Sequence, residues 1–283
     1  MNGNTQKKSL RADPFSLVMR VLVWGAALLT AGVLLALIAY ILIRGVPNLK
    51  LSLFELEYNS ENVSMFPSIV MTIYMTVLTL IITTPLGIGC AIYLTEYAKR
   101  GNKVVEVIRL AAETLSGIPS IVYGLFGMLF FVTALQWKNS ILAGSCTLAI
   151  MVLPLIIRST EEALKSVPDS YREASFGLGA GKLRTVVRVV LPPAMPGIVA
   201  GIILAVGRIV GETAALIYTA GTVAKITINP MESARTLAVH MYALSSEGLH
   251  TNEAFATGVV LLLVVLMLNA TSNAIAKRIT KGK

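Results

Sequence analysis

Charged residues are scarce in this 283-residue chain, where Asp, Glu, Lys and Arg together make up only 14% of the sequence. A soluble domain contains about 25%. Cysteine and histidine are scarcer still: Cys90 and Cys146 lie inside apolar stretches, and His240 and His250 stand alone. Disulfide frameworks and metal sites built on Cys or His need several such residues at close spacing. The sequence therefore excludes both, and we expect no metal and no cofactor.

Long apolar stretches, by contrast, are abundant, and 55% of the residues are hydrophobic. About 20 helical residues cross the ~30 Å apolar core of a bilayer, and only helices or closed barrels satisfy their backbone groups in lipid. The pattern predicts an all-α polytopic membrane protein, surrounded by membrane lipid, with six spans: Arg20–Ile43, Ser68–Leu94, Ile118–Leu135, Ile141–Ile157, Gly197–Ala220 and Ala254–Ala276. We expect the third and fourth spans to form a tight hairpin, because only Gln136–Ser140 separate them. The first span is too long for the apolar region of a cleaved signal peptide.

The basic residues are distributed unevenly around these spans. With the N-terminus in the cytoplasm, the inward segments hold 18 of the 24 Lys and Arg residues, and the outward loops hold Arg44, Lys50, Lys138, Lys225 and Arg235. This asymmetry follows the positive-inside rule. It explains the net charge of +9 without a nucleic-acid partner. We expect residues 1–19 and 277–283 to be cytoplasmic tails, residues 20–67 to be the first span and an outer loop, and residues 68–276 to be the core.

Two connections within this core are too long to be simple turns. The outer loop, residues 221–253, contains Glu232–Leu244, in which Leu237, Met241 and Leu244 share one helical face. That segment is either an interfacial helix on the outer surface or an ordered cover over the bundle. The inward loop, residues 158–192, contains the capping-box pattern Ser170 and Glu173. Glycines at 177, 179 and 181 should end that helix, and a second short helix should occupy Lys182–Val190. Such a pair of cytoplasmic helices is well shaped to dock in a groove of a partner protein.

The inward loop resembles the ATPase-docking loop of ABC importer permeases. That motif is Glu-Ala-Ala, a Gly four positions later, and Ile-x-Leu-Pro after nine more residues. The chain has Glu173-Ala174-Ser175, then Gly179, then Val189-Val190-Leu191-Pro192, so that only Ser175 and Val189 depart from it. The resemblance implies a type I (MetI-like) permease architecture. It also implies that Glu173, Ala174, Gly179, Leu191 and Pro192 couple this chain to two separate ATPase subunits.

The same loop contains a misleading glycine-rich stretch, from Phe176 to Leu183. A phosphate-binding loop needs Gly at the first of these positions and Ser or Thr at the last, between a strand and a helix. Here those positions hold Phe176 and Leu183. We therefore expect that the chain binds no ATP and is not an enzyme, and that ATP hydrolysis takes place in a partner subunit.

A second motif places charge inside the fifth span. Gly207-Arg208 and Gly211-Glu212-Thr213-Ala214 put Arg208 and Glu212 four residues apart, where they can share a helix face and pair. Charges inside a membrane are costly and usually face a polar path or a partner. The planar Arg fork suits a tetrahedral oxyanion. Glycines at 197, 201, 207 and 211 would let another helix approach closely. From the residues alone, a transport path and a structural ion pair both remain open.

This second motif resembles the signature of phosphate-specific permeases of the PstA type, as do Gly117–Phe126 and Arg158–Pro168. The resemblance implies a permease subunit for inorganic phosphate, with Arg208, Glu212 and Arg158 along the substrate path. From its position alone, Arg158 is equally a positive-inside anchor. The implied partners are a homologous permease of the PstC type, two ATPase subunits and an extracytoplasmic phosphate-binding protein. The implied location is the inner (plasma) membrane.

Three alternatives remain open at this point. The chain is a permease for another oxyanion, an ion-coupled secondary transporter in which Arg208 and Glu212 relay protons, or a membrane scaffold without transport. The docking loop argues against the last two, because a self-sufficient transporter has no use for it. The absence of an internal repeat also argues against a secondary transporter.

Overall fold

The structure, a computed structural model, describes residues 14–99 and 101–281, with the backbone alone at 14 and 275–281. Most of the expected cytoplasmic tails, residues 1–13 and 282–283, lies outside the described residues. The described chain is helical and contains no strand. The helices are α1 (Pro14–Gly45), α2 (Phe66–Ile92), α3 (Lys103–Ser116), α4 (Ser120–Gly127), α5 (Ile141–Lys165), α6 (Asp169–Gly177), α7 (Lys182–Thr185), α8 (Leu191–Val210), α9 (Ala214–Thr219), α10 (Leu237–Glu247) and α11 (Thr251–Lys281). Short 3-10 turns η1 (Val46–Asn48) and η2 (Leu51–Phe54) and π-helical turns η3 (Tyr93–Tyr97), η4 (Met128–Ala134) and η5 (Val186–Val190) join them.

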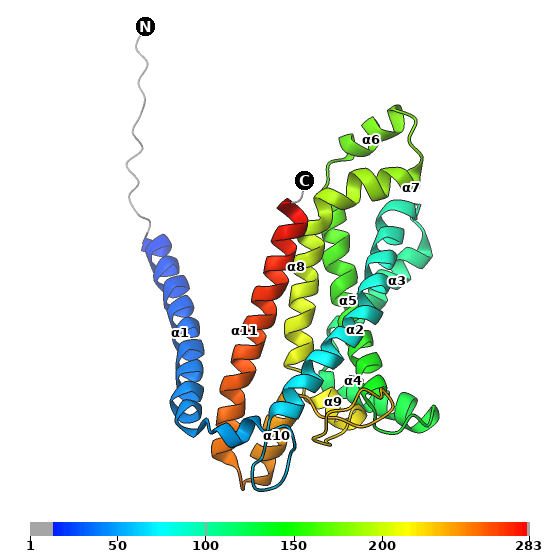
Figure 1. The fold of residues 1–283 in the computed structure, drawn as a ribbon. Coiled ribbons are helices and arrows are strands. Elements are labelled where there is room, and N and C mark those ends of the chain that lie inside the picture. Colours follow the sequence, from blue (N-terminus) through cyan, green and yellow to red (C-terminus); the bar gives the residue numbers. More distant parts are fainter. Residues whose placement is uncertain (1–13, 100, 282–283) are drawn as a thin grey trace.

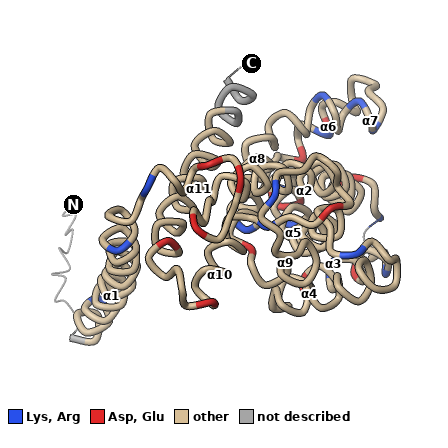
Figure 2. Tube along the Cα trace, turned by 60° about the horizontal axis from the view of Figure 1, so that its bottom comes forward, with Lys and Arg blue, Asp and Glu red and all other residues tan. Residues whose placement is uncertain are grey.

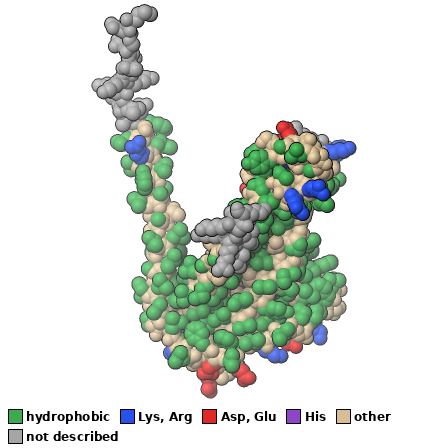
Figure 3. All heavy atoms as spheres, turned by 45° about the horizontal axis from the view of Figure 1, so that its top comes forward, with side chains coloured by type: hydrophobic (Ala, Val, Ile, Leu, Met, Phe, Trp, Pro, Cys, Tyr) green, Lys and Arg blue, Asp and Glu red, His purple; other side chains and the backbone are tan. Residues whose placement is uncertain are grey.

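Five stretches are long and apolar enough to cross a membrane: Phe15–Asn48, Phe66–Tyr97, Ile141–Lys165, Lys182–Val210 and Thr251–Ala274. A sixth span exists if α3 and the segment Ser120–Ala134 count as one span bent by 106°. Figure 3 shows hydrophobic side chains over the flanks, with charged side chains gathered at the two ends. The predicted all-α membrane protein of about six spans is thus confirmed.

The third and fifth spans differ from their predicted form. The segment between the second and third predicted spans contains helix α3, which precedes a sharp bend before α4. Pro119 explains the bend, because the residue before a proline avoids the helical conformation. The expected fifth span, Gly197–Ala220, is broken: α8 ends at Val210 and α9 begins at Ala214. The fourth span runs on to Lys165, and the last helix continues to Lys281.

Helix α5 is the centre of the bundle and packs between α2 and α8 (Figure 1). Its first turn is capped by Ser140, whose Oγ accepts a hydrogen bond from the Ala143 backbone N–H at 3.2 Å. Three hydroxyl groups of the neighbouring α2 are satisfied inside the core, because Thr72, Thr76 and Thr83 donate to backbone carbonyls one turn earlier. The contacts of α5 with α2 and α8 hold these three helices together as the core of the bundle.

Helix α1 stands away from the bundle over most of its length (Figure 1), and none of the residues in its apolar window is buried. It touches α11 only near Gly45, where a Cβ atom would meet the Phe255 backbone, and where the rings of Tyr40 and Phe255 pack edge to face at 5.5 Å. The start of α1, the end of α11, α6 and α7 all lie at one end of the molecule, and α9 and α10 lie at the other. Figure 2 shows that second end, with acidic residues on the loops around α10 and α11.

The helix expected in residues 221–253 is α10, which covers one end of the bundle. Leu237 and Leu244 are both fully buried, Met241 is partly buried, and the helix packs on α11 and α2. This packing fits the ordered cover, one of the two possibilities left open by the sequence.

Candidate functional site

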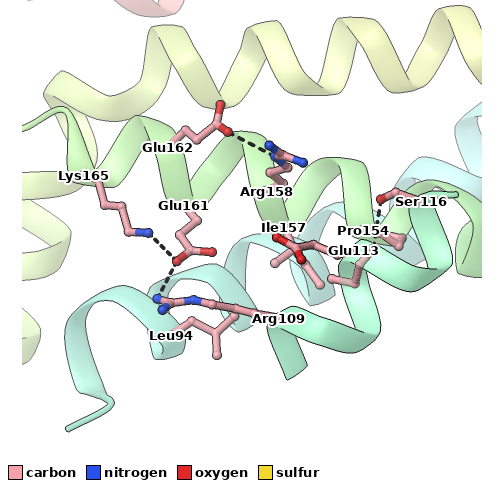
Figure 4. Close-up of a pocket in the computed structure, with 11 residues that line it drawn as sticks. Leu94, Arg109, Glu113, Ser116, Pro154, Ile157, Arg158, Glu161, Glu162 and Lys165 are labelled. Carbon is pink, nitrogen blue, oxygen red and sulfur yellow. Dashed lines mark hydrogen bonds and ion pairs between the residues drawn. The ribbon is translucent and has the colours of Figure 1, made fainter. Parts of the chain in front are cut away.

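A cavity of about 240 Å³ opens at the end of the bundle that carries α6, between the ends of α2, α3 and α5 (Figure 4). Its charged lining residues are Arg109, Glu113, Arg158, Glu161, Glu162 and Lys165. We call this cavity the inner pocket. Three basic and three acidic side chains line it, so the pocket as a whole is balanced in charge. An entering anion would have to compete with carboxylates for the basic groups.

Glu161 is the most enclosed charge of the inner pocket. Its Oε1 atom lies 2.6 Å from Arg109 Nη2 and 2.7 Å from Lys165 Nζ, and only 11% of its side chain is exposed. Lys165 lies one turn further along α5, whereas Arg109 reaches across from α3. The sequence analysis missed this cluster. The only signal in the sequence was the i, i+4 spacing of Glu161 and Lys165.

Arg158 lies at the edge of the same pocket. Its Nε atom is 3.2 Å from Glu162 Oε1, but about two thirds of each side chain is exposed. Exposed pairs of this kind contribute little to stability and exchange partners readily. The Arg158 guanidinium is therefore available to a passing anion. Arg158 was predicted as a path residue, and the structure places it at the inner end of α5 in a pocket.

Arg208 lies in the last turn of α8 and is half-buried. Among the side chains that the structure describes, none forms a hydrogen bond or an ion pair with its guanidinium. A Cβ atom built on the neighbouring Gly207 would meet no described atom within 4 Å, so the helix surface at Gly207 is open. A half-buried guanidinium without a described partner suits an anionic ligand or a partner chain.

The predicted pairing of Arg208 with Glu212 is wrong. The four-residue spacing requires an unbroken helix, but α8 ends at Val210 and Gly211 follows it. The Glu212 carboxylate turns to α9 instead, where its Oε1 accepts a hydrogen bond from the Ala215 backbone N–H at 3.0 Å. A buried carboxylate at a helix N-terminus is favourable because the backbone N–H groups there lack partners. Glu212 thus stabilises the break between α8 and α9.

The glycines of α8 divide into two pairs. A Cβ atom at Gly197 would lie 2.7 Å from the Cβ of Ala163, and one at Gly201 would collide with the Ser159 side chain. These two glycines allow α5 to approach closely, as predicted. Gly207 and Gly211 allow no such approach within the described chain. Arg208 follows Gly201 by seven positions, so Arg208 lies about 10 Å further from the α6 end of the bundle than Ser159 and its neighbour Arg158. The two arginines therefore belong to different depths of the bundle.

The docking loop forms α6 and α7 as an outlying pair (Figure 1). Glu173, Ala174 and Gly179 are exposed, and Leu191 and Pro192 are partly buried where α8 begins. The predicted capping box is wrong, because α6 begins after Pro168, whose side chain has no hydrogen-bonding group.

Gly179 ends the turn after α6 with a φ of +79°, a conformation that favours glycine. The second helix is not separate, since Lys182–Val210 runs on without a break.

The glycine-rich stretch from Phe176 to Leu183 connects α6 to α7, with no strand before it. The described residues also contain no group of three His, Cys, Asp or Glu side chains arranged to hold a metal ion. The arrangement therefore offers two arginines at different depths, Arg158 and Arg208, and an exposed helix, α6.

The chain is similar to known membrane components of transport systems. A family described as "binding-protein-dependent transport system inner membrane component" matches residues 83–282. The chain is 36% identical over 273 residues to the probable ABC transporter permease protein YqgI of Bacillus subtilis (strain 168), covering 90% of this chain and 92% of that protein. It is 37% identical over 197 residues to the phosphate transport system permease protein PstA of Yersinia pestis, covering 69% of this chain and 66% of that protein.

Among solved structures, an inward-facing form of the MetNI methionine ABC transporter shares the fold. The TM-score is 0.60 at 20% sequence identity, and the match covers 86% of this chain and 98% of that one. At this identity the likeness concerns the fold alone.

Proposed function

Because the chain belongs to the family of binding-protein-dependent transport system inner membrane components, it is an ABC importer permease, and we propose that its substrate is inorganic phosphate. The sequence likeness to a phosphate transport permease supports this substrate. The observation that carries the proposal is the Arg208 guanidinium, which is half-buried and has no hydrogen-bond or ion-pair partner among the described side chains. A planar, always-charged donor in that setting suits a tetrahedral oxyanion.

The proposed path passes two arginines at different depths. Arg208 would meet phosphate first, toward the outer end, and Arg158 would meet it at the inner pocket. Glu212 would act indirectly, by holding the break after Gly211 that leaves Arg208 at the end of α8. In the inner pocket, Glu161 and Glu162 already occupy the basic side chains. Phosphate would therefore bind weakly there and be released.

The proposed complex contains a similar permease of the PstC type, two ATPase subunits and an extracytoplasmic phosphate-binding protein. Helix α6 would dock on an ATPase through the exposed residues Glu173 and Ala174. Gly179 would end that helix, and Leu191 and Pro192 would join the docking loop to α8. With α6 in the cytoplasm, the start of α1 and the end of α11 face the cytoplasm as well. The chain would be a multi-pass protein of the inner membrane.

Phosphate uptake by the complete complex in proteoliposomes tests the role of Arg208. Because the Arg208 guanidinium has no partner among the described side chains, Arg208→Ala leaves no acid unpaired, and the complex should assemble at the wild-type level. Uptake should fall roughly tenfold or more, the usual effect of losing a charged hydrogen-bond donor. Arg208→Lys, which keeps the charge but loses the fork, should restore uptake only partly. Arg20→Ala, on the exposed face of α1, is the matched control.

Two outcomes would contradict the proposal. Wild-type uptake by a well-assembled Arg208→Ala complex would remove Arg208 from the path. Uptake of sulfate in place of phosphate by the wild-type complex would favour the alternative, a permease for another oxyanion.

A further inference from the structure

Arg172 lies beside the docking motif but points away from it. Its neighbours Tyr171, Glu173 and Ala174 are exposed, whereas only 14% of the Arg172 side chain is exposed. Helix α6 thus has two faces. One is open to a partner, and the other, which carries Arg172 and the buried Ser175, is turned toward the membrane domain.

The Arg172 guanidinium uses all three of its nitrogen atoms. Nε lies 3.1 Å and 3.3 Å from the two carboxylate oxygens of Glu96, and Nη2 lies 2.6 Å from Glu96 Oε1. Nη2 also donates to the Leu164 carbonyl at 2.9 Å, and Nη1 donates to the Val167 carbonyl at 2.8 Å. A further contact, 3.3 Å to Asp169 Oδ1, stays within α6. Only 7% of the Glu96 side chain is exposed.

These bonds connect α6 to two other elements: α5, which directly precedes it in the chain, and η3, which lies 76 positions earlier. Glu96 belongs to η3, the π-helical end of the second span, and Leu164 belongs to the last turn of α5. A charge-assisted fork to a carboxylate is strong and fixes direction, and a cation at a helix C-terminus is favoured by the helix dipole. Docking helix α6 is therefore tied to α2 and α5 together. We call this contact, Arg172 with Glu96 and the carbonyls of Leu164 and Val167, the α6 clamp.

Two further contacts stiffen the surroundings of the clamp. Ser175 Oγ lies 2.8 Å from Thr185 Oγ1, which joins α6 to α7. Lys182 Nζ lies 5.1 Å from the centre of the Tyr97 ring, which joins α7 to η3. The clamped ends also form walls of the inner pocket, because Leu94 and Lys165 both line it. A displacement of α6 would therefore reach the pocket through short, well-packed connections.

We propose that the α6 clamp transmits the movement of the docked α6 to α2 and α5, and so to the inner pocket. This inference rests on the proposed docking of α6 on an ATPase. Arg172 and Glu96 touch no substrate in this account and act as positioning residues. Their effect should appear in the coupling of hydrolysis to transport, rather than in substrate affinity or in ATP hydrolysis itself.

The measurement is phosphate transported per ATP hydrolysed, in proteoliposomes that contain the complete complex. Arg172→Lys keeps the charge and loses the fork, and Glu96→Gln keeps the shape and loses the charge. Each should lower the ratio several-fold while basal ATP hydrolysis and the half-saturating phosphate concentration stay at wild-type values. The ratio of the double variant should be no lower than that of the more affected single variant, because the two substitutions remove the same contact. Arg20→Lys, at an exposed arginine on α1 outside the docking loop, is the control and should leave the ratio unchanged.

Crosslinking separates this proposal from the one on which it rests. Ala174→Cys should crosslink to an ATPase subunit in the wild-type background and in both clamp variants. Absence of the crosslink in the wild-type background would contradict the docking and the transmission together. A crosslink with a wild-type ratio in both variants would overturn the clamp alone. So would a fall in uptake that merely follows a fall in the amount of assembled complex. If the wild type carries another oxyanion, that oxyanion replaces phosphate in the ratio.

Discussion

Three arginines of this chain show how the setting of a side chain decides its role. Arg208 is unpaired among the described side chains, whereas Arg172 has partners for every guanidinium nitrogen. Arg235, at the outer end, is 6% exposed, and its guanidinium lies 4.4 Å from the centre of the Tyr58 ring. The ring face stabilises the cation without a carboxylate. The setting of Arg208 suits the binding of a mobile anion. That of Arg172 suits a rigid connection between helices, and that of Arg235 suits the packing of the loops that cover the bundle.

The outer cover contains a histidine that should make its stability depend on pH. His240, on α10, is fully buried, and burial together with the charge of Arg235 lowers the pKa of His240 to about 3. In the unfolded chain this pKa is ordinary, near 6.5, so the unfolded state takes up the proton first as the pH falls. The contribution of His240 is therefore fully present above pH ~6.5 and is lost as the pH falls toward 3, by up to about 1.4 kcal/mol per pH unit.

Thermal unfolding in detergent at pH 7 and pH 5 measures this effect. The melting temperature of the wild type should fall between the two values, and that of His240→Gln should fall less. His250→Gln, at the start of α11, shows whether the loss of any histidine has the same effect. Equal shifts in the wild type and His240→Gln would mean that His240 does not titrate on unfolding.

At the scale of the element, α8 combines a packed half with an open half. Its first half carries Gly197 and Gly201 against α5, and its second half carries Arg208 and Gly207, where an added Cβ atom would meet no described atom. Helix α8 thus packs in the core through one half and presents Arg208, a residue of the proposed path, from the other half. The helix breaks after Val210. The segment that carries Arg208 therefore ends before α9, which packs on α4.

Alanine substitutions at two glycines of α8 should separate these halves. Gly201→Ala places a methyl group on the Ser159 side chain and should cost about 1–3 kcal/mol, the range for overpacking. Gly207→Ala meets no described atom and should be neutral or stabilise the helix by up to about 1 kcal/mol. The melting temperatures of the two variants, measured in the same detergent, should differ in this order. A stable Gly201→Ala would indicate that α5 and α8 can separate without cost.

At the scale of the whole molecule, the two ends have different tasks. Asn102 and Lys182 line one cavity near α6, so the start of α3 and the docking loop share an end. Ser140, at the start of α5, donates its backbone N–H to Thr219 at the opposite end, and Ile141 donates to Glu232 there. The bundle therefore separates a docking end from a covered end, with α11 running between the two.

Reporter fusions test which end faces the cytoplasm. Fusions at Asn102, Lys182 and Lys281 should report the cytoplasm, and fusions at Asn59, Asn139 and Glu247 should report the outside, because the basic residues are concentrated at the docking end. A cytoplasmic signal at Glu247 would overturn the orientation of α10 and α11. Fusions on both sides of α3 should also show whether the bent pair α3 and α4 crosses the membrane once.

The sequence by itself determined that the chain is helical with about six spans, and that a helix ends before Gly179. Each of these depends on a local property: the transfer of about 20 apolar residues into lipid, or the helix end that Gly179 imposes. Such properties act within one segment, so its composition is sufficient to predict them. The same local reasoning failed at Gly211, where four-residue spacing predicted an ion pair and the helix ended first.

Only the tertiary structure decided which charges meet. Glu96 and Arg172 stand 76 positions apart, and nothing in either segment indicates the other. Arg109 reaches Glu161 only because α3 folds back beside α5 after the second span. An ion pair of this kind depends on the relative placement of two packed elements, which the side chains between them fix collectively. The candidate path arginines could therefore be named from the sequence, whereas the inner pocket and the α6 clamp became visible only when the helices were packed together.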